Sequence, residues 1–248
     1  MKIADGVEML KLPMNMGGMV SMIYPTLIWD DNTVILVDAG LPDQIEEIRE
    51  KMSKTGVPFE KLNMIIVTHQ DIDHIGGIPD ILEASNNKVK IIAHEEDKPY
   101  IQGEKRLNKI TPERMAQFME QLNSMPEEQR EIMKALFENP PRASVDETRA
   151  DGEEVPYCGG ITVIHTPGHT PGHICLYIKE SKTLIVGDAL NIMDGELVGP
   201  NPQNTQDMDS AIKSLKKFTR YDIENVICYH GGLYTKDPNQ RIAELTKE

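Results

Sequence analysis

One stretch decides how this chain folds: Val67-Thr68-His69-Gln70-Asp71-Ile72-Asp73-His74-Ile75-Gly76-Gly77. The apolar run from Met64 to Val67 leads into it and predicts a short buried strand. The pair Gly76-Gly77 predicts that the chain then turns into a helix. Between the strand and the helix stand two His and two Asp, which must either face water or find partners.

These four polar side chains are a candidate metal site. Buried without partners, each neutral polar group would cost roughly 2–7 kcal/mol, and each charge would cost more. A divalent cation removes that cost because it binds neutral imidazole and ionised carboxylate. The spacing therefore favours a metal site, and a hydrogen-bonded surface turn is the alternative.

Length and composition exclude several classes of protein. The 248 residues can bury a large core, as one large domain or two small ones. The net charge of −14 argues against nucleic acid as a partner, because phosphates are bound by clustered Lys and Arg. It also argues against an anionic membrane surface. No apolar run approaches the roughly 18 residues that span a bilayer, the N-terminus resembles no secretion signal, and the three Cys form no CxxC pair. We therefore expect a soluble cytoplasmic protein.

The first third of the chain predicts strands with helices between them. Residues 7–12 and 20–29 predict two antiparallel strands joined by a Met-rich turn at 13–19. The Met side chains of that turn either pack inward or form an adaptable apolar wall over a pocket. Residues 33–37 predict a buried strand that ends at Asp38. Asp38 is either a turn former or an acceptor that orients a metal-binding His.

Two further elements follow in this part of the chain. Ile45, Ile48 and Met52 predict one apolar face of a helix that Gly56 ends. Residues 90–93 predict another short strand, and we interpret His94 after it as a structural side chain and not as a ligand.

Residues from about 98 to 146 predict a helical insertion. Thr111-Pro112-Glu113 and Pro126-Glu127-Glu128 are typical of helix starts, and Met115, Phe118, Met119 and Leu122 predict one apolar face. The segment has almost no strand pattern and too few apolar residues for a core of its own. We expect one domain over residues 1–248, in which this insertion acts as a lid or an interface.

Strand patterns resume in the last third, at residues 161–164, 174–178, 183–186 and 226–228, with helices at 208–218 and 239–247. A Gly/Pro-rich loop at 165–173 carries three His and is typical of a positioned functional loop.

Residues that can bind metal follow strand ends in both halves of the chain. Two facing half-sheets with helices outside would bring these ends to one edge. The candidate ligands are His69, Asp71, Asp73, His74, His169, Asp188 and His230. Seven ligands are too many for one tetrahedral ion and suit two, with Asp188 as the natural bridge.

The chain resembles the metallo-β-lactamase superfamily over nearly its whole length. Thr68 to Gly77 is similar to that family's HxHxDHxGG motif, and Thr-Pro-Gly-His at 166–169, Gly-Asp at 187–188 and His-Gly-Gly at 230–232 follow in the family's order. The resemblance implies an α/β fold, a four-layer αβ/βα sandwich with two metal ions at one edge. It implies that His69, Asp71 and His169 hold the first ion and that Asp73, His74 and His230 hold the second. It further implies that Asp188 bridges the two, with a water or hydroxide.

One position departs from the family pattern. Asp71 stands where most of the family has a second His. We expect two divalent ions with zinc favoured, and Asp71 adds iron or manganese as alternatives because hard oxygen ligands suit those metals. A second alternative is that Asp71 turns away and the first site is weak. His173 and His165 are expected to hydrogen-bond within their loop, with a supporting role for His173 as the alternative.

The resemblance implies a hydrolase in which hydroxide held by two metal ions attacks a small ester, lactone or thioester. Asp73 would orient the hydroxide and take its proton. The glyoxalase II-like and acyl-homoserine-lactone lactonase branches fit best, although those lactonases carry a Tyr where this chain has Asn191. A metal-binding or redox protein related to the flavodiiron branch is the non-hydrolytic alternative.

Overall fold

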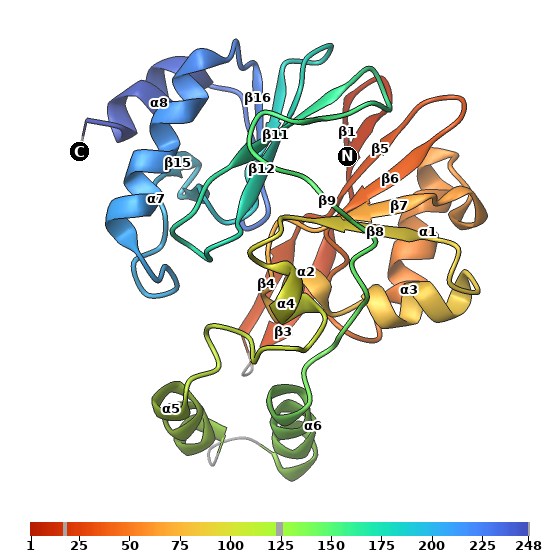
Figure 1. Cartoon of the computed structure of the whole chain (residues 1–248), viewed down its shortest axis with the longest axis vertical. Coiled ribbons are helices and arrows are strands. Elements are labelled where there is room, and N and C mark those ends of the chain that lie inside the picture. Colours follow the sequence, from red (N-terminus) through yellow and green to blue (C-terminus); the bar gives the residue numbers. More distant parts are fainter. Residues whose placement is uncertain (17–18, 123–125, 248) are drawn as a thin grey trace.

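Two β-sheets form the centre of the molecule in the computed structural model, which describes residues 1–16, 19–122 and 126–247 (Figure 1). In the first sheet, the strands β6 to β9 run parallel and the earlier strands pair antiparallel. Its hydrogen-bonded order is β1 (Lys2–Ala4), β2 (Val7–Met9), β5 (Thr26–Trp29), β6 (Val34–Val37), β7 (Met64–Ile66), β8 (Lys90–Ala93) and β9 (Glu147–Thr148).

The second sheet comes from the last third of the chain. Only β13 and β16 pair in parallel among its described strands. Its order is β10 (Glu154–Val155), β11 (Ile161–His165), β12 (Ile174–Ile178), β13 (Thr183–Ile185), β16 (Asn225–Cys228) and β17 (Gly232–Tyr234).

Helices cover the outer face of each sheet. The helices α1 (Ile45–Thr55) and α3 (Ile78–Ala84) lie against the first sheet, and α7 (Met208–Leu215) and α8 (Pro238–Leu245) lie against the second (Figure 1). The short helices η1 (Phe59–Lys61) and η2 (Lys216–Arg220) extend these layers. The predicted αβ/βα sandwich is therefore confirmed.

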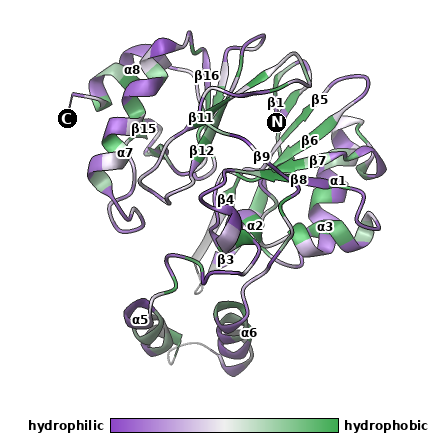
Figure 2. Ribbon diagram, viewed as in Figure 1, coloured by the Kyte–Doolittle hydropathy of each residue, from purple (hydrophilic) through white to green (hydrophobic). Residues whose placement is uncertain are grey.

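Alternating side chains of the strands build three apolar layers. Ile35 and Ile66 point between the two sheets, whereas Leu36 and Ile65 point toward the helices. Strands with both faces buried contain continuous apolar runs, which is why they were visible in the sequence. Figure 2 shows this hydrophobic colouring along the strands. Truncating a fully buried side chain such as Ile66 to Ala would cost about 2–5 kcal/mol.

The ends of several strands meet at one edge of the sandwich. Asp38 directly follows β6, and the β7 strand leads into Thr68. In the second sheet Asp188 follows β13 and His230 follows β16. The two halves are joined at this edge by a backbone hydrogen bond of 2.9 Å, donated by Ile174 N–H to the Thr68 carbonyl. The fold thereby gathers residues that are far apart in the sequence.

Two β-hairpins differ from the prediction or were not predicted. The Met-rich segment was predicted as a loop, but most of it belongs to two strands. These strands, β3 (Leu12–Met16) and β4 (Met19–Ile23), pair antiparallel with each other. Gly17 and Gly18 of the predicted turn lie outside the described residues. The hairpin of β14 (Asn191–Met193) and β15 (Glu196–Val198) was missed, because its strands are short and partly exposed.

Gly76 and Gly77 form the expected turn into the helix α3. The structure adds a short helix, α2 (Ile72–Ile75), within the His/Asp stretch, and both glycines have right-handed helical backbone angles. Their function is close packing. A Cβ on Gly77 would lie 2.3 Å from the Ala39 carbonyl oxygen, and a Cβ on Gly76 would lie 2.6 Å from the Pro42 Cδ atom. Glycine is needed here because the loop after β6 crosses the helix backbone.

The helical insertion has the expected content. It contains α4 (Lys98–Ile101), α5 (Pro112–Leu122) and α6 (Glu127–Glu138), and the helix starts at Pro112 and before Glu127 are confirmed. Figure 1 shows α5 and α6 side by side beyond the edge of the sheets. Leu122 is buried and Met115 is half-buried, whereas the side chain of Phe118 lies outside the described part. No helix among the described residues has the length and apolar character needed to cross a membrane. Cytoplasmic location stays a prediction.

Candidate metal centre

The first group of candidate ligands joins three segments of the chain. His69 and Asp71 come from the loop after β7, His169 from the loop between β11 and β12, and Asp188 from the loop after β13. One ligand atom of each lies within 4.8 Å of the others. The Asp71 Oδ2 atom is 3.3 Å from His69 Nε2 and 3.1 Å from His169 Nε2. The Asp188 Oδ2 atom is 3.3 Å from His169 Nε2.

The second group lies on the other side of Asp188. It contains Asp73, His74 and His230. The Asp73 Oδ2 atom is 3.2 Å from His230 Nε2 and 3.8 Å from His74 Nε2. The Asp188 Oδ1 atom is 3.3 Å from His74 Nε2 and 3.5 Å from His230 Nε2. Asp188 thus directs one carboxylate oxygen to each group, as a bridging ligand would.

The residues present fit divalent metal ions. His69 Nε2, His74 Nε2 and Asp188 Oδ1 are buried and make no hydrogen bond with the described residues. Buried polar atoms without partners are rare in folded proteins. Ligands about 2.0–2.1 Å from a tetrahedral ion lie roughly 3.3 Å from one another, close to the separations seen here. The structure therefore brings together all seven predicted ligands, in the two predicted groups.

The charges around the two groups favour cations. Burial opposes ionisation of Asp71, but the Lys109 ammonium and the neighbouring imidazoles hold the pKa of Asp71 well below its usual range. Burial also opposes ionisation of Asp188, and His230, His169 and His74 outweigh it, so its pKa is well below the usual value. Burial and the nearby His74 lower the pKa of His69 to about 4, which keeps this imidazole neutral. Ionised carboxylates and a neutral imidazole are the ligand forms that metals bind.

Asp38 holds the second group in place. Its Oδ2 atom lies 2.8 Å from His74 Nδ1 and accepts a hydrogen bond from the Thr68 hydroxyl at 2.8 Å. Its Oδ1 atom accepts from the Thr68 backbone N–H at 2.8 Å. A proton on His74 Nδ1, donated to Asp38, leaves the Nε2 lone pair directed at the second group. Asp38 adopts a φ of +61°, a strained conformation that a functional site can retain.

His173 lies behind the ligands and not among them. Its Nε2 atom accepts a hydrogen bond from the Asp188 backbone N–H at 3.1 Å, and its Nδ1 atom lies 2.8 Å from the Thr166 hydroxyl oxygen. Burial, with His69 and His169 nearby, holds the pKa of His173 well below its usual value. The neutral ring can therefore fix the backbone that carries Asp188.

Asp97 is a supporting residue that our sequence interpretation missed. Its fully buried carboxylate accepts hydrogen bonds from the Gln70 backbone and side chain, from the Thr170 hydroxyl and from the Gly172 N–H. Gln70 lies between two ligands of the first group, and Thr170 follows a third. A signal did exist, because Asp97 follows the end of β8 as Asp38 follows β6, but its acidic neighbours obscured it.

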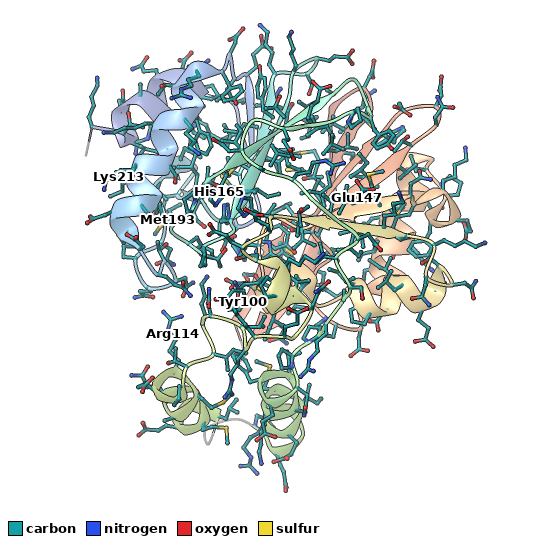
Figure 3. The ribbon with its side chains drawn as sticks, viewed as in Figure 1. Tyr100, Arg114, Glu147, His165, Met193 and Lys213 are labelled. Atoms are coloured by element: carbon teal, nitrogen blue, oxygen red, sulfur yellow. The ribbon has the colours of Figure 1, made fainter. Side chains whose placement is uncertain are left out.

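A cavity of about 610 Å³ opens beside the two groups. Asp71, Asp73, Asp188 and His230 form part of its wall. The insertion supplies another part, including the cations Lys109 and Arg114. Arg114 donates a hydrogen bond of 2.9 Å to the Gln203 carbonyl, and Figure 3 shows it reaching from α5 toward the sheets. These two cations were not predicted, since no local pattern indicates which residues of an insertion face a site.

A third group of possible ligands, His94, Glu96 and His165, has a different geometry. The His94 and His165 rings stack with centroids 3.9 Å apart and an angle of 13° between their planes. Lone pairs of nearly parallel rings do not converge on one ion. His94 is 4% exposed and its Nδ1 atom accepts a hydrogen bond from the Glu96 N–H. This geometry fits the expected structural role of His94.

Comparisons with known proteins agree with this architecture. The family described as the metallo-beta-lactamase superfamily matches residues 19–230. The probable metallo-hydrolase YflN of Bacillus subtilis is 30% identical over 219 residues, which cover 82% of this chain and 76% of that protein. A hydroxyacylglutathione hydrolase of Buchnera aphidicola is 27% identical over 67% of this chain and 47% of its own length. A metallo-beta-lactamase family protein of Thermus thermophilus has a similar solved structure, with a TM-score of 0.72 and 22% identity over 99% of this chain and 80% of that one. The names of these relatives and the metal-binding geometry support a hydrolase enzyme, and the chain belongs to the metallo-beta-lactamase superfamily.

Proposed function

We propose that this chain is a dinuclear metal-dependent hydrolase of small esters, lactones or thioesters. The observation that carries the proposal is the position of Asp188, whose two oxygens face two separate groups of ligands beside an open cavity. A pair of divalent ions bound there would supply an activated water near neutral pH and would polarise the carbonyl of a substrate. Zinc is the favoured metal, with iron or manganese as the alternatives that Asp71 introduces.

The protein's own residues supply orientation and a proton acceptor. Asp73 lines the cavity, and its side chain is 18% exposed, so it can meet both a water and a substrate. The Tyr229 hydroxyl donates a hydrogen bond of 2.5 Å to the Asp73 backbone carbonyl and fixes this part of the helix α2. His74 and His230 oppose the effect of burial on Asp73 and lower its pKa, which keeps the carboxylate ionised and able to take a proton.

The shape of the site suits a substrate with an apolar arm. A second cavity, of about 960 Å³, shares Gln203 and His230 with the first. Tyr24, Ile192 and Val198 are among the side chains that line it. An acyl chain lying there would place its carbonyl near His230 and Asp188. This cavity favours an acyl lactone as a second candidate substrate, and the relative named hydroxyacylglutathione hydrolase favours a thioester.

We also propose that the chain is one domain and that the insertion at about 98–146 is a lid. Ile110, Gln117 and Phe137 belong to the insertion and line the cavity that contains the metal ligands. Side chains in such positions limit the size of the substrate. Phe137→Ala should therefore raise KM for small substrates and admit larger ones, without changing metal content. Unchanged kinetics for every substrate would assign the insertion to an interface instead.

The experiment combines metal analysis with a substrate panel. Protein purified without added metal is analysed for zinc, iron and manganese, and is then assayed with lactones, thioesters, aryl esters and phosphodiesters. We expect two metal ions per chain and turnover of one carboxylic ester class. Asp188→Asn should abolish turnover and reduce metal content. Asp222→Asn is the matched control, because the Asp222 side chain is exposed, pairs with Lys182 and lines neither cavity. A protein with two bound ions and no turnover of any substrate would refute the proposal, and bound iron would then favour the redox alternative.

A further inference from the structure

A lysine of the insertion contacts the first group of ligands. The Lys109 ammonium forms an ion pair with Asp71 Oδ2 and lies 2.5 Å from His169 Nε2. The Lys109 side chain is 13% exposed and the Asp71 side chain 18%. The ammonium therefore donates to an oxygen and a nitrogen that the first metal ion would use. Within the described ranges, the ion pairs of Asp73, His74 and His230 are with one another and with other Asp side chains, and none is with a Lys or Arg.

The contact involves the position at which this chain departs from its family. Asp71 adds a negative charge where a neutral imidazole is usual, and Lys109 supplies the opposite charge beside it. An ammonium has three N–H donors and no acceptor, so it can satisfy the same lone pairs that a cation would. It cannot share His169 Nε2 with a divalent ion, because this imidazole nitrogen has a single lone pair.

The backbone around Lys109 is fastened to the metal-binding loop. The Asn108 backbone N–H donates a hydrogen bond of 2.7 Å to Gln70 Oε1, and Leu107 and Ile110 are buried on either side. These contacts hold the backbone that carries Lys109 beside the metal-binding loop. The adjoining cavity of about 610 Å³, which Lys109 lines, gives the side chain room to move aside while its backbone stays in place.

We propose that Lys109 is a built-in competitor of the first metal ion. The second group, Asp73, His74 and His230, then binds its ion first and tightly. The first group, His69, Asp71 and His169, binds its ion only by displacing the Lys109 ammonium into the cavity, and so binds it more weakly. This inference rests on the proposed two-ion site, but it does not depend on which substrate is hydrolysed.

The test is a zinc titration of metal-free protein, with a chromophoric chelator as competitor. We expect wild-type protein to show two affinities. Lys109→Met, which keeps the apolar stem and removes the charge, should tighten the weaker site by about tenfold or more, which is the scale on which groups contacting metal ligands change affinity. The tighter site should change little. Lys109→Arg should keep the weak site weak, because it keeps the charge.

Arg114→Met is the matched control. Arg114 lines the same cavity but donates to the Gln203 carbonyl and not to Asp71 or His169, so this variant should retain both wild-type affinities. The proposal is overturned if Lys109→Met leaves the weaker site unchanged or weakens it further, or if Arg114→Met tightens it equally. Tightening in Lys109→Met without turnover of any substrate would sustain this inference while refuting the proposed hydrolysis. Turnover with two bound ions, together with unchanged metal affinity in Lys109→Met, would sustain the proposed hydrolysis while refuting this inference.

Discussion

Replacing Asp97 by Asn should weaken the binding of the first metal ion and leave the binding of the second largely unchanged. The Asp97 Oδ1 atom accepts from Gln70 Nε2 at 3.0 Å and from the Gly172 N–H at 2.9 Å. Its Oδ2 atom accepts from the Gln70 N–H at 3.0 Å and from the Thr170 hydroxyl at 2.8 Å. Asn retains one oxygen and turns the other acceptor into a donor. The Thr170 hydroxyl can rotate and accept from the new amide, but the Gln70 N–H is left unpaired.

The expected loss in the free energy of unfolding follows from these four hydrogen bonds. An unpaired buried donor costs about 1–3 kcal/mol, and the remaining hydrogen bonds lose the strengthening that the carboxylate charge gives them. We expect Asp97→Asn to lower the free energy of unfolding by roughly 2–4 kcal/mol. Gln70 lies between His69 and Asp71, and Thr170 follows His169, so the same change should displace three ligands of the first group. The affinity of the first ion should fall by about 10–100-fold.

The second ion should be largely retained, because Asp38 and Tyr229 support its ligands independently of Asp97. Urea unfolding of metal-free protein measures the stability loss, and chelator competition measures the two metal affinities. Asp146→Asn is a suitable control, since Asp146 accepts from the Ile91 N–H and contacts no ligand. Equal weakening of both ions in Asp97→Asn, or loss of stability with both affinities intact, would refute the reasoning.

Three further predictions concern packing, pH and the ligand set. Gly77→Ala should lower the melting temperature sharply, because its Cβ would lie 2.3 Å from the Ala39 carbonyl oxygen, and an unchanged thermal melt would contradict this. Burial and the nearby His165 lower the pKa of His94 to about 4, so the unfolded chain binds a proton there before the folded one does. The resulting stability is complete above about pH 6.5 and is lost as the pH falls toward 4, and melts from pH 7 to 4 should show a smaller loss in His94→Gln than in wild type. Asp71→Ala should weaken the first ion by at least roughly 10–100-fold in a metal titration, and two ions bound with unchanged affinity would remove Asp71 from the ligand set.

The sequence predicted best the parts of the fold that are buried on both faces. The strands β7 and β12 are short, uninterrupted runs of hydrophobic residues. The helix α1 has one apolar face and ends at Gly56, which adopts a left-handed conformation. The hairpin β14–β15 lacked such a pattern, because its strands are short and most of their residues are exposed or half-buried. The Met-rich hairpin β3–β4 was misread because Pro13, Asn15 and the two glycines are typical of turns, whereas pairing along the hairpin decides its structure.

The candidate ligands could be predicted because each follows a strand end within a short motif. Asp97 was harder to identify, because it stands four residues after β8 among other acidic side chains and its importance lies in contacts with distant residues such as Gly172. Lys109 could not be predicted, because it reaches His169 from a position without a local pattern. The order of strands in the two sheets brings these segments together, and sequence periodicity does not contain that order.

Asp71 and Lys109 are best understood as one charge pair shared between the motif and the insertion. Asp71 alone would add a negative charge beside Asp188 and Asp73, in a place where the carboxylates already repel one another. Lys109 relieves that repulsion in the metal-free protein, and a metal ion relieves it when bound, so the two cations are alternatives. Because Lys109 enters from the insertion, whose other side chains line the same cavity, displacement of Lys109 would change the wall that a substrate meets. Metal loading and substrate binding would then be coupled through a single side chain, which explains why a carboxylate at this position and a cation in the insertion belong together.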